Sequence, residues 1–197
     1  MYKGQKHAGS GVAGPVGRAL AVPSLLRGAC LLVLLAAVGC ARTSAEKDAP
    51  PVIYVTAPQI GRLLAEGTNT VTVLHFWATW CPPCVEEIPR VVALAKKYRA
   101  RGVRVLLVSA DAPQDRDAVT RFLADHHVDE PTYLADNLND ECIKAVSPKW
   151  SGAVPASFFY AADGALAEGW EGAHDLAAFE QVVEKLLHQK KQGASKP

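Results

Sequence analysis

The most constraining feature of this chain is the segment Trp80-Cys81-Pro82-Pro83-Cys84, in which two residues separate two cysteines. The apolar residues 71–77 before it predict a buried strand, and the residues after Cys84 predict a helix. A cysteine at such a junction lies at a helix N-terminus, where unpaired amides and the positive end of the helix dipole favour a thiolate. Because a thiolate attacks disulfides, the segment predicts a redox pair with Cys81 as nucleophile and Cys84 as resolving thiol.

The same cysteine spacing also occurs in zinc sites. A tetrahedral zinc site needs about four ligands, but the sequence has no second Cys-x-x-Cys pair and no His-x-x-x-His pair. We therefore favour a redox disulfide over zinc and expect neither a bound metal nor a cofactor. A peroxidase of the peroxiredoxin type would need a threonine three residues before its reactive cysteine, where this chain has Ala78.

The residues around the pair resemble a known family. Residues 76–84, Phe-Trp-Ala-Thr-Trp-Cys-Pro-Pro-Cys, with Glu87, Pro89 and a later Val154-Pro155, look like the active-site segment of thioredoxin-fold proteins of the TlpA/ResA type. Those proteins are extracytoplasmic thiol-disulfide oxidoreductases anchored to bacterial membranes. The resemblance implies an α/β, thioredoxin-like fold with a TlpA/ResA-type insertion over residues 128–149.

The hydrophobic pattern leads to the same fold class. Strands are predicted at residues 52–55, 71–77, 103–108 and 131–134, followed by a hairpin at 156–160 and 165–170. Helices are predicted at residues 58–65, 83–101, 116–125 and 138–146, and a last helix begins after the capping residue Asp175. This order predicts a mixed central β-sheet flanked by helices on both faces. We expect one domain over residues 52–190 and a disordered tail over residues 191–197.

The resemblance also implies roles for residues outside the cysteine pair. Glu87, on the same helix face as Cys84, would lie in the substrate cleft and handle protons, whereas the alternative is a solvated surface acid. Pro155 would be a cis-proline facing the disulfide, and the backbone at Val154 would pair with a substrate strand. The alternative is an ordinary strand-opening proline. We expect Trp80 to contact the substrate beside Val154 and Pro155.

His75 is the point at which the sequence departs from its relatives. Six residues before the first active-site cysteine, thioredoxins usually have Asp and TlpA/ResA-like chains often have Asn. An imidazole beneath the pair could accept the Cys84 proton during resolution. The alternative is a core histidine that hydrogen-bonds to a backbone carbonyl. Cys142 lies among apolar residues and is predicted to be a buried free thiol.

Residues 1–39 are predicted to be a signal peptide. An apolar run at residues 29–38 is too short to span a bilayer as an ordinary helix, but it fits a signal-peptide core. The run ends at Cys40 in a segment that resembles a lipoprotein processing site. We therefore expect residues 40–51 to comprise a lipidated Cys40 and a flexible tether. The alternatives are ordinary signal cleavage or an uncleaved anchor.

The net charge and the predicted location of the protein limit the kinds of partner that it could bind. The chain has 21 basic and 20 acidic residues, and loss of a leader with four basic residues would leave a net charge of −3. Such a mild charge does not indicate a nucleic-acid partner. We expect an exported, membrane-anchored lipoprotein that faces the periplasm or cell exterior as a monomer, with protein disulfides or dithiols as its partners.

The residues between the cysteines favour reduction. Pro82 and Pro83 cannot donate backbone amides to the Cys81 sulfur. We therefore expect a Cys81 pKa lowered from about 8.5, but not to the roughly 3.5 of the strongest oxidants. A reductant must be recharged, and the resemblance implies a membrane thiol donor of the DsbD/CcdA type. Its substrate could be an apocytochrome c in cytochrome c biogenesis, another protein disulfide or a copper-site dithiol.

Two other functions stay open at this stage. A disulfide-donating oxidase would use the same cysteine pair in the opposite direction. A copper-binding metallochaperone module would use the reduced Cys81/Cys84 pair as ligands, although the better-known copper carriers of this fold have three residues between their cysteines.

Overall fold

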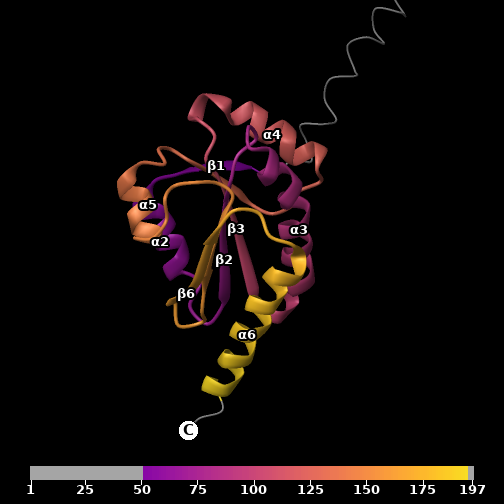
Figure 1. Ribbon diagram of the computed structural model, residues 1–197, viewed down its shortest axis with the longest axis vertical. Coiled ribbons are helices and arrows are strands. Elements are labelled where there is room, and N and C mark those ends of the chain that lie inside the picture. The colour runs from indigo at the N-terminus through magenta and orange to yellow at the C-terminus, as the bar shows by residue number, and fades with distance from the viewer. Residues whose placement is uncertain (1–50, 195–197) are drawn as a thin grey trace, which may run out of the picture. The chain divides into compact units, whose positions relative to one another are not determined.

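The computed structural model describes residues 51–194 of the 197-residue chain (Figure 1). The predicted signal peptide, the predicted lipidation site Cys40, the predicted tether up to residue 50 and the last three residues lie outside this range. Within the range, no helix has the length and apolar character needed to cross a membrane.

A six-stranded mixed sheet forms the centre, in the order β1-β4-β3-β2-β5-β6. The strands are β1 Val52–Val55, β2 Val71–Trp77, β3 Val103–Ser109, β4 Thr132–Ala135, β5 Ala156–Tyr160 and β6 Leu166–Glu171. The first four strands in the spatial order are mutually parallel, whereas β5 pairs antiparallel with β2, and β6 antiparallel with β5. Strands β2 and β3 lie inside the sheet and are covered on both faces, which is why both are almost continuously apolar.

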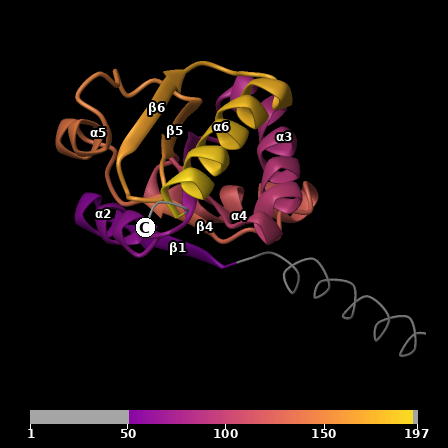
Figure 2. The same cartoon turned by 90° about the horizontal axis from the view of Figure 1, so that it is seen from below.

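Helices cover both faces of this sheet (Figures 1 and 2). They are α2 Ala57–Ala65, α3 Pro82–Tyr98, α4 Arg116–Asp125, α5 Asp140–Val146 and α6 Leu176–Ala194. Helices α3, α4 and α6 pack over one face, on a hydrophobic cluster that includes Val73, Trp77 and Phe179. Helices α2 and α5 pack over the other face, on a cluster that includes Leu74 and Phe76. The alternation along β2 places His75 on the face of α3 and α6.

These observations confirm the predicted fold class. The helix predicted at residues 83–101 ends at Tyr98 and continues as a 3₁₀ turn over Arg99–Arg101. Gly102 then ends it with a left-handed backbone conformation, φ 77°, as a glycine can adopt without strain. The region expected as the TlpA/ResA-type insertion contains β4 and α5.

The last helix is longer than predicted. Helix α6 continues to Ala194, so residues 191–194, expected within the disordered tail, are helical in this structure. Buried Leu186 and Leu187 hold the preceding turn on the domain, and the Lys190 ammonium donates a hydrogen bond to the Asn69 carbonyl. These contacts explain how the helix extends beyond its apolar stretch.

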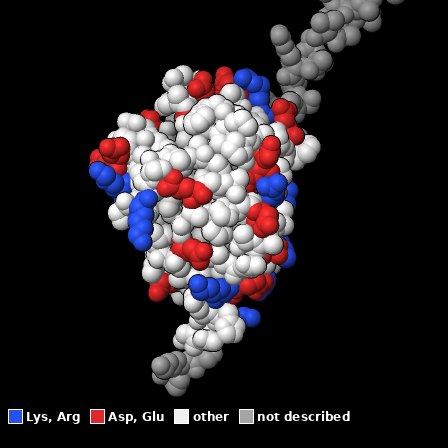
Figure 3. Space-filling model, in the orientation of Figure 1, with Lys and Arg blue, Asp and Glu red and all other residues white. Residues whose placement is uncertain are grey.

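Basic and acidic side chains are interspersed on the face of the molecule shown in Figure 3. This mixed distribution fits the mild net charge calculated from the sequence.

Replacement of a fully buried aromatic residue tests the packing of α6. Phe179 is 0% exposed, and its ring lies 5.4 Å from that of Trp170 and 5.9 Å from that of Phe159, between centroids. We expect Phe179→Ala to lower the free energy of unfolding by about 3–5 kcal/mol, because it leaves a cavity. Leu166→Ala, at a position 39% exposed, should change it by less than about 1 kcal/mol. Equal urea midpoints for the two variants would contradict this packing.

Candidate active site

A disulfide joins Cys81 and Cys84 directly after strand β2. Cys81 occupies the N-cap of α3, and its sulfur accepts a hydrogen bond from the Cys84 amide at 3.3 Å. Pro82 and Pro83 fill the first positions of the helix, where a backbone N–H has no partner within the helix and proline is well tolerated. Cys81 is 4% exposed and Cys84 is 0% exposed. The order of exposure agrees with the roles predicted for the two thiols, although both are largely covered in this oxidised form.

The loop before Cys81 is held by Asp111, a residue that the sequence analysis missed. The buried Asp111 carboxylate accepts hydrogen bonds from the Thr79 amide at 3.0 Å and the Thr79 hydroxyl at 2.5 Å. It also accepts one from the Ser109 hydroxyl at 2.6 Å. Asp111 therefore fixes the loop that presents Trp80, whose side chain is 63% exposed. The sequence signal that could have identified Asp111 is its position, two residues after the end of the buried strand β3, which lies next to β2.

The Val154–Pro155 peptide bond is cis and lies against the disulfide. The carbonyl oxygen of Val154 is 3.6 Å from the Cys81 sulfur. Pro155 is buried and Val154 is half-buried, immediately before β5. The structure therefore brings Cys81, Val154 and Pro155 together, and Trp80 adjoins them through the chain.

Glu87 is buried, in contrast to its exposed neighbour Glu86. Its Oε1 accepts a hydrogen bond from the His174 amide at 2.6 Å. Burial raises the pKa of Glu87, while the His174 hydrogen bond and the charge of Arg90 oppose that rise. The interpretation of Glu87 as a solvated surface acid is therefore wrong. The carboxyl lies beneath the protein surface and not in an open cleft.

His75 lies between Ser157 and Glu87 and is fully buried. Its Nδ1 is 2.9 Å from the Ser157 hydroxyl, and its Nε2 is 3.7 Å from Glu87 Oε2. Neither Nε2 nor Oε2 has a hydrogen-bond partner within the described part of the chain. Burial lowers the pKa of His75 to about 3, so the imidazole is neutral near neutral pH. The partner of this core histidine is a serine hydroxyl, where the alternative interpretation had expected a backbone carbonyl.

Trp170 and His174 complete the surroundings of Glu87. Their rings stack with centroids 4.2 Å apart, and the Arg90 guanidinium lies 3.5 Å from the His174 carbonyl oxygen. The Gly172 amide donates a hydrogen bond to the Pro155 carbonyl at 2.8 Å. The segment after β6 therefore connects the cis-proline to the buried carboxyl. Sequence reasoning did not assign a role to His174, because it has no motif of its own.

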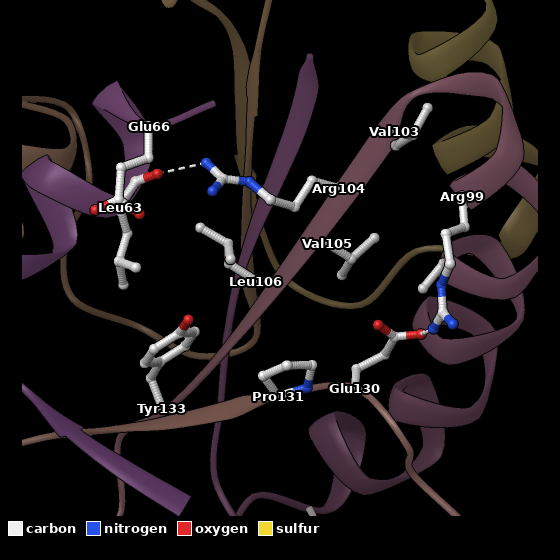
Figure 4. Close-up of a pocket in the computed structure, with 11 residues that line it drawn as sticks. Leu63, Glu66, Arg99, Val103, Arg104, Val105, Leu106, Glu130, Pro131 and Tyr133 are labelled. Carbon is white, nitrogen blue, oxygen red and sulfur yellow. Dashed lines mark hydrogen bonds and ion pairs between the residues drawn. The ribbon is translucent and has the colours of Figure 1, made fainter. Parts of the chain in front are cut away.

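A separate cavity of about 340 Å³ lies at the opposite end of α3 from the disulfide (Figure 4). Arg99 pairs there with Glu130, and Arg104 donates a hydrogen bond to the Leu63 carbonyl.

Cys142 is a free thiol in the hydrophobic cluster beneath α2 and α5, and burial raises its pKa. Within residues 51–194, no three His, Cys, Asp or Glu side chains gather in an arrangement that could hold a metal ion.

A thioredoxin-like sheet with a Cys-x-x-Cys disulfide at a helix N-terminus and a facing cis-proline defines a class of dithiol proteins. The chain belongs to the Redoxin family, whose model matches residues 47–175. It is 28% identical over 179 residues to the thiol-disulfide oxidoreductase ResA of Oceanobacillus iheyensis, covering 84% of this chain and 90% of that one. It is 27% identical over 174 residues to ResA of Bacillus thuringiensis subsp. konkukian, covering 82% and 95%.

A similar solved structure is that of a putative thiol:disulfide interchange protein DsbE from Chlorobium tepidum. It has a TM-score of 0.54 and 28% identity, and the match covers 63% of this chain and 84% of that chain. These findings confirm the resemblance drawn from the sequence. The protein is a thiol-disulfide oxidoreductase with a thioredoxin-like fold.

The low pKa of His75 makes stability depend on pH. The unfolded chain has the ordinary His pKa of 6.5, against about 3 in the folded state. Between these values the unfolded state binds more protons, so folding is destabilised as the pH falls. We expect a contribution approaching about 1.4 kcal/mol per pH unit. The raised pKa of Glu87 has the opposite effect on stability as the pH falls. A variant that lacks His75 is therefore needed to isolate the contribution of His75.

Urea unfolding between about pH 7 and pH 5 measures this slope. His75→Asn should remove the His75 contribution, so that its stability falls less on acidification than that of the wild type. His188→Asn, at an exposed position on α6, should keep the wild-type slope. Identical slopes for all three proteins would mean that His75 is not the group responsible.

Proposed function

We propose that this protein reduces disulfides of exported proteins outside the cytoplasm, with Cys81 as the attacking and Cys84 as the resolving thiol. The observation that carries the proposal is the placement of the pair. The Cys81 sulfur lies at the N-cap of α3, beside the cis-Val154–Pro155 peptide, and Cys84 is enclosed one helical turn further on. Of the two cysteines, Cys81 is 4% exposed, whereas Cys84 is 0% exposed.

In the proposed reaction the reduced protein transfers two electrons to a substrate. The Cys81 thiolate attacks one sulfur of the substrate disulfide, which forms a mixed disulfide and releases the other sulfur as a thiolate. Cys84 then loses its proton and attacks the Cys81 sulfur, which forms the Cys81–Cys84 disulfide and releases the second substrate thiolate. The substrate is reduced to a dithiol, and the protein is left in the oxidised form described here.

We propose that Trp80, Val154 and Pro155 form the substrate contact. Trp80 is 63% exposed, more than any other large apolar residue in residues 51–194, and it directly precedes the attacking cysteine. Backbone pairing of an extended substrate segment with Val154 would place a substrate sulfur near Cys81, because strand addition aligns side chains at regular intervals.

We propose that Glu87 and His75 together handle the proton that Cys84 must lose. Glu87 lies three residues after Cys84 on the same face of α3, and its raised pKa makes its carboxylate a stronger base than an ordinary one. His75 faces Glu87 across 3.7 Å. Since burial keeps His75 neutral, we assign the resting charge and the accepting role to Glu87, and we assign to His75 a supporting role beside that carboxylate.

The proposed location and electron source rest on the sequence and the family. The predicted leader and Cys40 support export and lipid anchoring. An extracytoplasmic reductant needs a continual supply of electrons, for which we propose a membrane thiol donor of the DsbD/CcdA type. The substrates we propose are exported protein disulfides, including those of cytochrome c biogenesis.

The reduction potential of the Cys81–Cys84 pair tests the direction of electron flow. We expect a value near or below about −220 mV, which suits a reductase that is recharged by a donor. The full chain would be equilibrated in dithiol redox buffers and alkylated, and the peptide that holds both cysteines would be quantified by mass spectrometry. A value near about −120 mV would instead indicate an oxidant that donates its disulfide. Cys142→Ser serves as the control, because it removes the buried free thiol.

Replacement of Glu87 and His75 tests the proton step. We expect Glu87→Gln to slow resolution of the mixed disulfide on the order of 100-fold near neutral pH, because the base is lost. His75→Asn should slow the same step by a smaller factor. The lifetime of the mixed disulfide with an oxidised peptide would be followed by acid quenching and mass spectrometry. Glu86→Gln is the matched control, because Glu86 is exposed on the same turn of α3. Wild-type lifetimes for both Glu87→Gln and His75→Asn would remove this role.

A further inference from the structure

A row of three buried or half-buried side chains crosses the sheet on strands β2, β5 and β6. His75 on β2 is the register partner of Ser157 on β5, and Ser157 is the register partner of Trp170 on β6. Side chains of paired residues share one face of a sheet, and this face is the one covered by α3 and α6. Figure 2 shows β5 and β6 side by side with α6 packed over them.

The row closes into a ring through Glu87. The His174 ring stacks on Trp170, the His174 amide binds Glu87 Oε1, and Glu87 Oε2 faces His75 Nε2. Ser157 is 1% exposed, and its hydroxyl lies 2.9 Å from His75 Nδ1. The mechanism above gives Ser157 no role, although it makes the side-chain hydrogen bond of His75.

The chemistry of imidazole determines what this hydrogen bond does. A neutral imidazole has one N–H donor and one acceptor nitrogen, so the partner of one nitrogen sets the state of the other. His75 Nε2 faces a carboxyl oxygen, which can accept an N–H. If Nε2 carries the proton, Nδ1 is the acceptor, and the Ser157 hydroxyl is the donor that satisfies it.

We propose that Ser157 is a positioning residue for the dithiol reaction: its hydroxyl holds His75 in the Nε2–H tautomer and thereby directs an N–H at the Glu87 carboxylate. This inference rests on the proposed function, in which Glu87 receives the Cys84 proton. It adds Ser157 as the group that determines which nitrogen of His75 carries the proton. An N–H directed at Oε2 stabilises the charged carboxylate that accepts the proton.

Loss of the hydroxyl has a defined consequence. Without a donor at Nδ1, the imidazole can adopt the other tautomer, whose Nε2 lone pair faces Glu87. That lone pair favours the protonated carboxyl, which cannot accept a proton. The other groups that face the pair are the His174 amide and the Arg90 charge near Glu87, and the edge of the Phe179 ring near His75. None of these contacts is with Nδ1, so they do not replace the serine.

Two variants separate the hydroxyl from the volume of the side chain. Ser157→Ala removes the hydroxyl, and Ser157→Thr retains it. Thr72→Val is the matched control, because it removes a buried hydroxyl from β2 on the opposite face of the sheet, where it has no hydrogen-bond partner in the described range. All proteins would be studied as the full chain.

The first readout is the tautomer of His75, from ¹⁵N NMR of histidine-labelled protein with the signal assigned by its loss in His75→Asn. We expect the Nε2–H form in the wild type, Ser157→Thr and Thr72→Val, and loss of that form in Ser157→Ala. An Nδ1–H form in the wild type would overturn the proposal, even if neither Ser157 variant folded.

The second readout is the pH profile of mixed-disulfide resolution. We expect Ser157→Ala to raise the pH of half-maximal rate by about one unit, equivalent to about tenfold at a fixed acidic pH. Attack by Cys81 should keep its wild-type rate, and Ser157→Thr should restore the profile. An unshifted profile for Ser157→Ala, with Glu87→Gln still slow, would overturn the role of Ser157 alone. If Glu87→Gln resolves like the wild type, the proposed proton step fails instead.

Discussion

The connection between β2 and α3 is the constraint on which the rest of the structure depends. Strand β2 lies inside the sheet, paired with β3 on one side and β5 on the other, and all seven of its residues are buried. Its register therefore cannot slip without exposing apolar side chains. Because β2 is held so firmly, the start of α3 is fixed as well, and Cys81 is placed at the helix N-terminus, where its sulfur accepts a hydrogen bond from the Cys84 amide. The cis-proline, Asp111 and the buried carboxyl are arranged around this one junction.

Two buried ionisable groups, Glu87 on α3 and His75 on β2, make this region unfavourable to desolvate. Glu87 and His75 are both 0% exposed. Burial raises the pKa of Glu87 and lowers that of His75, so it favours the neutral form of each. Desolvation of such groups is unfavourable unless hydrogen bonds compensate. The His174 amide and the Ser157 hydroxyl supply part of that compensation, and the remaining two polar atoms face each other at 3.7 Å. Such a pair is poorly suited to a purely structural core, which an apolar residue would fill at lower cost. Buried ionisable groups with shifted pKa values are common at functional sites, which is consistent with the proton step that we propose for this pair.

Residue patterns were sufficient for the main elements of the fold. Strand 71–77 and helix 116–125 were predicted with the bounds that the structure shows, because each has a strong hydrophobic period and clear flanking residues. The end of α6 was not, since the contacts of Lys190 with Asn69 join segments that are far apart in the chain. Among site residues, the cysteine pair and Pro155 could be identified from local motifs. Asp111, Ser157 and His174 could not, because each acquires its role only through a contact with another strand, helix or loop.

The amino-acid sequence by itself determined the chemistry of this protein. Two cysteines at a strand–helix junction predict a redox disulfide wherever the chain folds as its hydrophobic pattern directs, because spacing and helix geometry are local properties. Tertiary structure alone decided what surrounds that disulfide. The pairing of β2 with β5 brings Ser157 to His75, although 82 positions separate them, and the segment before α6 delivers the His174 amide to Glu87. Burial of Glu87 follows from the same packing, since the helix position that it occupies would be equally consistent with exposure to water. Long-range packing sets the desolvation and the hydrogen-bond partners of an ionisable group, and no local sequence pattern encodes either.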